Sequence, residues 1–366
     1  MTVKWSIAKS YILVGVLSLG LGLVPGLCAQ TVSVFATGFN NPRGLKFGPD
    51  GNLYVAEGGA GGTNSTAGQC TQVVAPVGPY TGGFTGRISK VTPDGTVTTV
   101  ADNLPSSQTS VPEGSLISGV ADVAFLGNTL YAVLAGAGCS HGVLGVDNGV
   151  LKVNPNGTTK MIADLSVFVE QNPVANPEPG DFEPDGTWYS LIAKNGIFFT
   201  VEPNHGELDS ITPGGNIRRI ADISNTQGHI VPTALASDGQ NFYVGNLDTF
   251  PIKDGSSKIM KITPNGQLTT VYIGFSDIVG LTFDSKGRLY VLENTTGNPF
   301  PTPFTAQILR VDGKNDYTLI ASGATSTLSL PTAMTIGPDG NLYVSNWGFG
   351  LPPDGEGEVL KITLPD

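Results

Sequence analysis

Short apolar runs alternate with polar turns along the chain, and one pair of runs recurs at nearly regular intervals. Residues 44–55 read GLKFGPDGNLYV, and residues 333–344 read AMTIGPDGNLYV. Looser copies lie at 123–131, 191–199, 234–244 and 280–291. Each copy joins two runs rich in β-branched and aromatic residues through a turn that contains Asp, Asn or Gly. This pattern predicts a β-hairpin in every copy.

A second predicted hairpin follows each copy. The first four of these turns contain Pro and Gly and lie at 92–95, 154–157, 212–215 and 263–266, and the fifth lies near Asp312. The sixth hairpin begins at Glu358 and ends after a single strand. Six units of two hairpins predict an all-β fold, a six-bladed β-propeller. A β-sandwich or an open β-solenoid is the alternative.

The N-terminal end of the array supplies the strand that its last unit lacks. Residues 31–36 (TVSVFA) resemble the fourth strands at 97–101 (VTTVA) and 217–221 (IRRIA). We expect residues 31–36 to pair beside 358–363 and close the ring, because closure hides two sheet edges that otherwise promote aggregation. Residues 30–366 then form a single six-bladed β-propeller domain.

Strand order assigns every loop to one of two faces. The links between strands 2 and 3 of a blade share a face with the links between blades. The long insertions all belong to this set, at about 58–86, 135–148, 247–257 and 294–306. We call this side the loop-rich face, and the opposite side, which carries only short hairpin turns, the trimmed face. Loops on a rigid scaffold commonly carry binding and catalysis, so we expect function on the loop-rich face.

Residues 1–29 have the pattern of a secretory signal peptide. Two lysines precede an apolar run at 11–24, and Cys28 and Ala29 end the segment. We expect cleavage after Ala29, which gives a periplasmic or secreted protein without a membrane span. The alternatives are a permanent membrane anchor, for which the apolar run is short, and a lipoprotein linked through Cys28.

Composition supports this fold and restricts the class of partner. Of the 366 residues, 50 are Gly and 26 are Pro, while 13% are charged and 40% are hydrophobic. Such a chain has too many turn residues for a helical bundle and too much apolar content for a disordered chain. The formal net charge is −11, and loss of the two leader lysines makes it −13, which argues against nucleic-acid binding. We expect a monomer.

Two cysteines, Cys70 and Cys139, remain once the leader is removed. They lie in the long insertions of the first and second units. An even number of cysteines in an exported chain indicates a disulfide, so we expect these two residues to be bonded.

One position of the repeat carries an oxygen-bearing side chain in five of the six units. It lies two residues after the Leu-Tyr-Val triplet and holds, in unit order, Glu57, Leu134, Glu202, Asn246, Glu293 and Asn346. Pseudo-symmetry predicts that the five polar side chains converge at the mouth of the central channel, as ligands for Ca²⁺ or another divalent cation. The alternative is that they cap backbone groups or face water.

Further candidates lie in the links of the loop-rich face. Arg43 and Tyr189 enter the first strands of units one and three, where they either reach the channel mouth or pack against neighbouring blades. His205 and His229 are candidate general bases or metal ligands, and we take His141 as structural. Loop aromatics that form a candidate cup for an aromatic ligand are Tyr80, Phe84, Phe250, Phe300, Phe304, Trp347 and Phe349.

Over residues 32–362 the chain resembles the ScyD/ScyE family. The resemblance rests on residues 41–45 (NPRGL), 53–57 (LYVAE), the glycine-rich insertion with Cys70, 184–190 (PDGTWYS) and 202–208 (EPNHGEL). It implies an exported propeller associated with the production of scytonemin, an indolic and phenolic sunscreen pigment. It carries over no catalytic residues. The blade rhythm is also similar to that of NHL-type propellers more broadly.

Two hypotheses of function follow. In the first, the propeller binds or scaffolds a small aromatic molecule or a protein on its loop-rich face, in late assembly of a scytonemin-like pigment. In the second, it is a metal-dependent enzyme of the lactonase, lyase or oxidative-coupling type, with its site at the top of the channel. The second rests on similarity to six-bladed lactonases and streptogramin lyase, which use a metal there.

Overall fold

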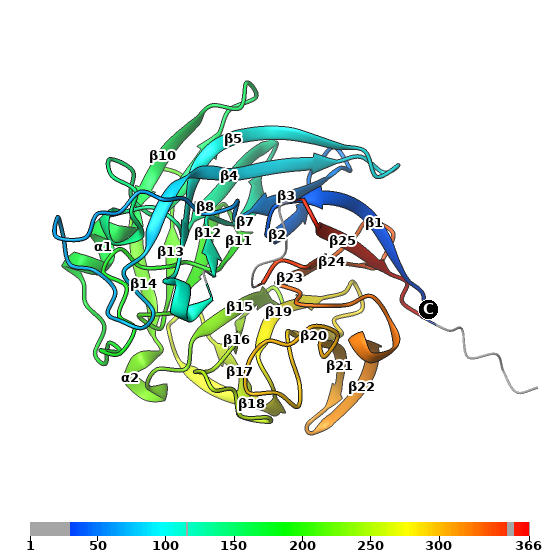
Figure 1. Cartoon of the computed structure of the whole chain (residues 1–366). Coiled ribbons are helices and arrows are strands. Elements are labelled where there is room, and N and C mark those ends of the chain that lie inside the picture. Colours follow the sequence, from blue (N-terminus) through cyan, green and yellow to red (C-terminus); the bar gives the residue numbers. More distant parts are fainter. Residues whose placement is uncertain (1–29, 115, 350–354, 366) are drawn as a thin grey trace, which may run out of the picture.

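Six antiparallel sheets stand around a central axis as the blades of a propeller (Figure 1). The computed structural model describes residues 30–114, 116–349 and 355–365. The predicted leader, with Cys28, lies outside these residues. Within the described ranges, no helix is long and apolar enough to cross a membrane. The six sheets around one axis confirm the predicted six-bladed β-propeller and exclude the sandwich and solenoid alternatives.

In blades 1 to 3 the strands follow one another in chain order from the axis outward (Figure 1). Blade 1 contains β2 (Pro42–Phe47), β3 (Leu53–Glu57), β4 (Thr81–Val91) and β5 (Val97–Gln108), and β6 (Ile117–Ser118) pairs with the end of β5. Blade 2 contains β7 (Val120–Leu126), β8 (Thr129–Leu134), β9 (Gly149–Val153) and β10 (Thr159–Asp164), and the helix α1 (Leu165–Gln171) follows it. Blade 3 contains β11 (Ser190–Lys194), β12 (Ile197–Glu202), β13 (Glu207–Ile211) and β14 (Ile217–Asp222), and α2 (Ser224–Gln227) follows it.

Blades 4 and 5 repeat this order, and blade 6 joins the two ends of the chain. Blade 4 contains β15 (Pro232–Ser237), β16 (Phe242–Asn246), β17 (Ser257–Ile262) and β18 (Leu268–Phe275). Blade 5 contains β19 (Ile278–Phe283), β20 (Leu289–Glu293), β21 (Gln307–Gly313) and β22 (Asp316–Ser322). Blade 6 contains β23 (Ala333–Ile336), β24 (Leu342–Asn346), β25 (Gly357–Ile362) and the N-terminal β1 (Val32–Phe39).

The predicted closure of the ring is confirmed. Strand β1 pairs antiparallel with β25, and Val32 lies opposite Ile362. The N-terminal strand thus covers the edge of β25 that would otherwise expose unpaired backbone groups.

Aromatic contacts between neighbouring blades explain why the hairpin sequence repeats. The ring of Tyr54 in blade 1 lies 4.9 Å from that of Phe125 in blade 2, in an edge-to-face arrangement. Tyr343 in blade 6 makes the same contact with Phe47 in blade 1, also at 4.9 Å. The tyrosine hydroxyls bond an aspartate in their own hairpin turn; Tyr54 donates to Asp50 at 3.0 Å. Each repeat therefore supplies both halves of a contact that its neighbours complete.

The Pro-Gly turns between the third and fourth strands hold adjacent blades together. Gly215 has a φ of +88°, and a Cβ at this position would lie 2.2 Å from the carbonyl oxygen of Ile162 in β10, the outer strand of blade 2. Gly266 approaches the carbonyl oxygen of Ile220 in blade 3 in the same way. Only glycine allows both this backbone conformation and this close approach.

One expected loop boundary is wrong. Residues 81–86 were assigned to the long insertion of blade 1, but they belong to β4, which pairs with an equally extended β5. Gly82 and Gly83 pair with Ser107 and Ser106, so this glycine-rich sequence is part of the strand. As a result, β4 is longer than the third strands of the other blades. The long hairpin β4–β5 rises along the loop-rich face (Figure 1).

Candidate functional site

The five oxygen-bearing residues of the repeat occupy one position of the fold. Each is the last residue of the second strand in its blade, and each is almost completely buried. Their side chains bond the backbone of the segment that leads into the blade. Glu57 accepts from the amide of Asn40 (2.8 Å), Glu202 from Thr187 (2.7 Å), Glu293 from Ser276 (2.6 Å) and Asn346 from Ser329 (2.7 Å), while Asn246 donates to the carbonyl of Ile230 (2.9 Å).

These side chains do not form the shared cluster at the channel mouth that we expected. The second strand lies one strand away from the axis, and its last side chain turns toward the link between blades. Among the described residues, no group of three or more His, Cys, Asp or Glu side chains is placed to hold a metal ion. Capping of backbone groups accounts for all five residues, and binding of Ca²⁺ stays a prediction that the geometry does not support.

The same position has different electrostatics in different blades. In blade 1, Nε and Nη2 of Arg87 lie 2.8 and 2.7 Å from the two carboxylate oxygens of Glu57, and Ser89 donates at 2.5 Å. In blade 5, Glu293 accepts from the side-chain amide of Gln307, and burial raises the pKa of Glu293 to about 7. The two carboxyl groups therefore have different partners in their own blades, an arginine for Glu57 and an uncharged amide for Glu293.

All three histidines of the chain lie around one segment of the loop-rich face, residues 181–186. Each points Nε2 at an acceptor of this segment: His141 at the carbonyl oxygen of Gly186 (3.1 Å), His205 at that of Glu183 (3.0 Å) and His229 at Oδ1 of Asp181 (3.5 Å). His141 and His205 are buried. The structure brings the histidines together as supports of one loop, and a catalytic role for His205 or His229 stays a prediction.

Glu183, which the sequence analysis did not single out, is the centre of this segment. Tyr80 donates its hydroxyl to Oε1 of Glu183 at 2.8 Å, and Nε2 of His141 lies 3.4 Å from Oε2. Burial raises the pKa of Glu183 to about 8 and lowers that of His141 to about 4, so both groups are neutral near pH 7. Because the carbonyl of Gly186 can only accept, His141 carries its proton on Nε2 and Ser107 donates to Nδ1 at 2.9 Å.

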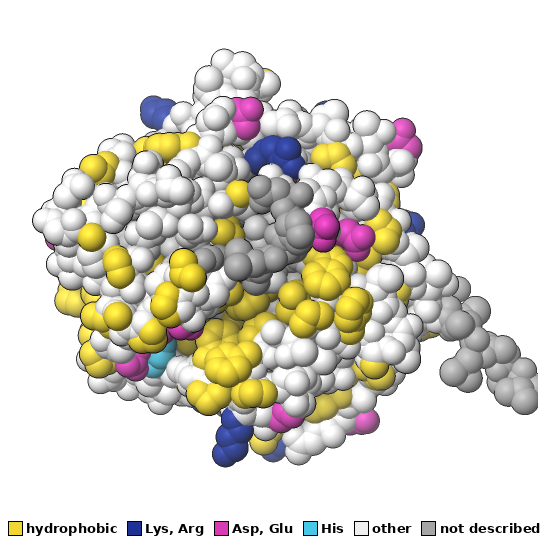
Figure 2. Space-filling model, viewed as in Figure 1, with side chains coloured by type: hydrophobic (Ala, Val, Ile, Leu, Met, Phe, Trp, Pro, Cys, Tyr) yellow, Lys and Arg dark blue, Asp and Glu magenta, His cyan; other side chains and the backbone are white. Residues whose placement is uncertain are grey.

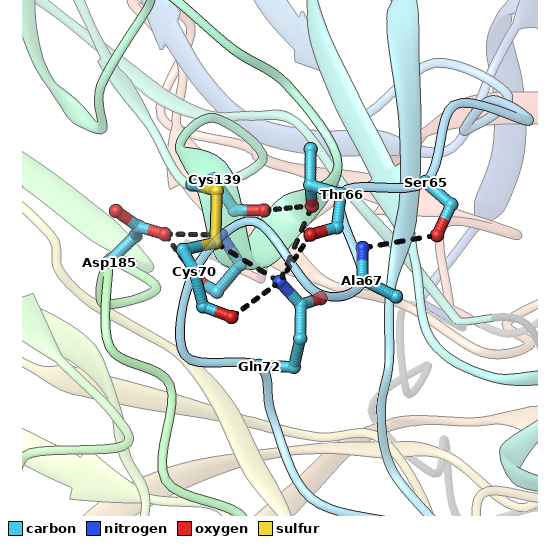
Figure 3. Close-up of a disulfide and its surroundings, with 8 residues drawn as sticks. Ser65, Thr66, Ala67, Cys70, Gln72, Cys139 and Asp185 are labelled. Carbon is cyan, nitrogen blue, oxygen red and sulfur yellow. Dashed lines mark hydrogen bonds between the residues drawn. A yellow bond between two sulfur atoms is a disulfide. The ribbon is translucent and has the colours of Figure 1, made fainter.

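The disulfide between Cys70 and Cys139 is confirmed, with a Cα–Cα distance of 6.3 Å (Figure 3). It joins the long insertion of blade 1 to the link between β8 and β9 of blade 2. Thr66 donates to the carbonyl of Cys139, and Asp185 accepts from the amide of Ser140 at 2.6 Å. The bond therefore holds the insertion against the segment that the histidines support.

Arg43 and Tyr189 lie together at the channel mouth, where both are partly exposed. The hydroxyl of Tyr189, in blade 3, donates to the carbonyl of Thr332 at 2.8 Å, in the opposite blade 6. Arg43 donates to the carbonyl of Ile117, between blades 1 and 2. The cavity beside them has a volume of only about 40 Å³, room for a few water molecules. The two side chains thus close the channel from above.

Two buried aspartates, which the sequence analysis missed, lie at the innermost strands. Asp122 of β7 accepts from the amide of Leu191 at 2.7 Å in the next blade, and burial raises the pKa of Asp122 to about 6. Asp277, just before β19, is fully buried, and within the described structure neither of its carboxylate oxygens has a hydrogen-bond partner. Burial raises the pKa of Asp277 well above the usual range, which favours the neutral acid, and a charge on Asp277 would raise the pKa of Tyr189. An acidic residue inside or next to an apolar strand was the available signal for both.

Four aromatic side chains gather beside the closed mouth, and we call them the mouth patch: Phe250, Phe300, Phe304 and Trp347. Phe250 and Phe300 stack at 5.8 Å, and Phe304 meets Trp347 edge to face at 5.5 Å. Phe300 and Phe304 remain 55% and 48% exposed. Figure 2 shows hydrophobic side chains gathered on this face over blades 4 and 5.

The segment 329–332 connects the mouth patch to the channel mouth. Ser329 accepts from the amides of Trp347 (2.9 Å) and Phe304 (3.1 Å), through its carbonyl and its hydroxyl respectively. Thr332 accepts from Tyr189. Of the other aromatics expected in the cup, Tyr80 is buried against Glu183, and Phe84 is exposed on β4, in blade 1. The rings from blades 4 to 6 therefore lie together as the mouth patch, whereas Tyr80 and Phe84 do not belong to it.

Comparison with known proteins supports the fold. No protein-family model and no curated protein matches the chain. A gluconolactonase from Xanthomonas campestris is a similar solved structure, with 12% identity, a TM-score of 0.53, and coverage of 91% of this chain and 89% of its own. A protein of unknown function from Bacteroides thetaiotaomicron has 13% identity and a TM-score of 0.58, and covers 92% of this chain and 76% of its own. A luciferin-regenerating enzyme has 11% identity and a TM-score of 0.52, over 92% and 95%.

At these identities the comparisons establish a shared six-bladed propeller and nothing about the reaction. Several of the similar propellers are enzymes, including the gluconolactonase and the luciferin-regenerating enzyme. Membership of the ScyD/ScyE family, export and a role in pigment production therefore belong to the proposal that follows.

Proposed function

We propose that this protein is an exported propeller of the ScyD/ScyE type that binds a small planar aromatic molecule on its mouth patch. The observation that carries the proposal is the exposure of Phe300 and Phe304 beside a closed channel. These two exposed rings of the blade 5 loop, together with the partly exposed rings of Phe250 and Trp347 from blades 4 and 6, form an apolar patch of the kind that marks an interaction site. The disulfide is consistent with export, because such bonds persist in oxidising compartments.

The geometry suits a flat ligand that lies on the surface. Tyr189 and Arg43 block entry into the channel, so the ligand stays above them and between the ring pairs. Offset-stacked and edge-to-face contacts each contribute about 0.5–1.5 kcal/mol beyond area burial, which suits indole and phenol rings. A scytonemin-like pigment or its precursor has both ring types, which is the basis for proposing a role in late pigment assembly.

Fluorescence titration tests this function. Trp347 is partly exposed in the mouth patch while Trp188 is buried, so p-cresol bound at the patch should alter the Trp347 emission. We expect Phe300→Ala and Phe304→Ala to weaken binding about tenfold each, equivalent to about 1.4 kcal/mol. Phe84→Ala is the matched control, because Phe84 is 45% exposed in blade 1, away from the patch. Equal affinity in all three variants would reject the mouth patch as the site.

A second candidate function is an enzyme at the channel mouth, of the lactonase, lyase or oxidative-coupling type. One observation favours it: among the described residues, Asp277 is a buried carboxyl without a hydrogen-bond partner, and it lies close enough to Tyr189 to influence the pKa of that phenol. Unpaired titratable groups of this kind are frequent in active sites. Asp277→Asn should abolish turnover of a lactone or aromatic substrate while leaving p-cresol binding at the mouth patch unchanged. Binding without turnover in the wild-type protein would favour the first function.

A further inference from the structure

A second site is indicated on the trimmed face, where blade 2 keeps a cation but lacks the turn aspartate that accompanies it in blades 1, 4, 5 and 6. In blades 1, 4, 5 and 6 the turn between the first two strands contains an aspartate that accepts from a second-strand tyrosine. These pairs are Asp50 with Tyr54 (3.0 Å), Asp238 with Tyr243 (3.1 Å), Asp284 with Tyr290 (3.3 Å) and Asp339 with Tyr343 (3.0 Å).

A cation on the third strand accompanies each of these pairs. The residue opposite the tyrosine is Lys90, Lys261, Arg310 or Lys361 in blades 1, 4, 5 and 6. In blade 6 the ammonium of Lys361 lies 2.7 Å from Asp339. In blade 1 the charge of Lys90 helps to lower the pKa of Asp50, after hydrogen bonds from Asn52 and Tyr54. The turn aspartate thus partly balances the cation of its own blade.

Blade 2 keeps the tyrosine and the cation but lacks the acid. Lys152 lies opposite Tyr131, and the turn between β7 and β8 consists of Gly127 and Asn128. Among the described residues, no ion pair includes Lys152. In a mature chain that carries a large negative charge, this exposed lysine is a local positive centre for an anion.

A groove lies beside this lysine, between blades 1 and 2. Its volume is about 590 Å³, within the range of small-molecule sites. Lys90 and Lys152 line it from the two blades, the rings of Tyr54 and Phe125 form an aromatic wall, and Asn128 is part of its rim. No Asp or Glu is among the residues that line the groove.

We propose that this groove binds a small aromatic carboxylate. Lys152 pairs with the carboxylate, because the turn beside it in its own blade carries no acid, and Lys90 adds positive charge from the other side. Tyr54 and Phe125 contact the ring of the ligand. The groove lies on the face opposite the mouth patch, so the two sites are independent.

Isothermal titration of the full mature protein with three probes tests the ligand class. We expect benzoate to bind in the millimolar range, and benzyl alcohol, which has the same ring without the charge, to bind at least about tenfold more weakly. Inorganic phosphate, which has charge without a ring, should also bind more weakly than benzoate. Equal affinity for benzyl alcohol would overturn recognition of the carboxylate, equal affinity for phosphate would overturn recognition of the ring, and absence of benzoate binding would overturn the proposal.

Two variants locate the site. Lys152→Gln should weaken benzoate about tenfold, and Asn128→Asp should do the same, because it restores an internal acid of the kind that the other turns carry. Lys160→Gln is the matched control, since Lys160 is an exposed lysine of the same blade outside the groove. All three changes affect exposed or turn positions, and unchanged melting temperatures would show that the fold is kept. Wild-type affinity in Lys152→Gln, or equal loss in Lys160→Gln, would overturn the assignment.

Discussion

At the scale of single residues, Glu183 shows how burial sets the chemistry of this protein. Its carboxyl is enclosed by the blade 1 insertion, the disulfide-linked turn and the segment 181–186, and it accepts from Tyr80. Burial raises its pKa to about 8, far above that of a carboxyl in water. A neutral Glu183 therefore belongs to the stable form of the loop-rich face, and its ionisation opposes folding.

The raised pKa of Glu183 predicts that stability falls as the pH rises from about 4.5 to about 8. A carboxyl whose pKa is about 8 when folded and near 4.5 when unfolded contributes stability that is fully present below pH 4.5 and lost as the pH rises through 8. Asp122 and Glu293 act in the same direction, but their pKa values of about 6 and 7 place their effect lower. We expect the melting temperature to decline between pH 5 and 8, and Glu183→Gln to flatten that decline.

The control for this prediction is Glu170→Gln, which changes an exposed glutamate of α1. Differential scanning calorimetry from pH 5 to 9 provides the measurement. A pH profile of Glu183→Gln that parallels the wild type between pH 5 and 8 would show that Glu183 is already ionised in the folded protein.

The carboxylates of the repeat also show that packing decides where a side chain points. The register that aligned Glu57, Glu202 and Glu293 is correct, since each ends a second strand. Their direction was not predictable, because the sequence does not show that an amide of the preceding link lies within reach of each oxygen. A buried carboxylate that accepts from a backbone amide is a satisfied structural group, and it needs no metal.

At the scale of elements, the Pro-Gly turns contribute to the fold in two ways, as hairpin turns and as contacts between blades. The turn sequence predicted a hairpin, and the glycine provides the positive φ that the turn needs. The structure adds that the same glycine touches the outer strand of the preceding blade. The turn therefore determines both the hairpin and the contact between blades.

Substitution of two glycines of blade 3 separates the effect of the positive φ from the effect of the contact between blades. Gly215→Ala should lower the free energy of unfolding by about 2–4 kcal/mol, because it combines a strained φ with a Cβ 2.2 Å from a carbonyl oxygen. Gly196→Ala should lower it by only about 1 kcal/mol, because Gly196 has a φ of +81° but no atom within 4 Å of its Cβ position. Urea denaturation of both variants measures the difference. Equal losses would show that the contact with Ile162 does not constrain the blades.

At the scale of the whole molecule, the ring is stable only when its two ends meet. Strand β1 comes from the N-terminus, β25 from the C-terminus, and their pairing makes every blade a neighbour of two others. The disulfide adds a covalent link between the insertions of blades 1 and 2. The mouth patch and the groove both depend on this closed ring, since each is built from more than one blade.

Deletion of residues 30–37 tests this dependence. We expect the shortened protein to melt at a lower temperature and to aggregate, because the edge of β25 is then free to pair with other chains. A synthetic peptide of residues 30–40 should restore part of the melting temperature, since it binds only the folded ring. Thermal melting with light scattering measures both effects. A truncated protein that melts and scatters like the full-length chain would contradict the role of β1 in closure.

The sequence by itself determined the number of blades, the closing strand, the cysteine pair and the register of the second strands. These features follow from local alternation and turn chemistry, which repeat along the chain and need no knowledge of distant contacts. Tertiary structure alone decided where the side chains at those positions point. It buried Glu183 between Tyr80 and His141, closed the channel with Tyr189, and left Lys152 beside an open groove. Each of these outcomes depends on groups that lie far apart in sequence, because burial and charge balance arise only when the blades pack against one another.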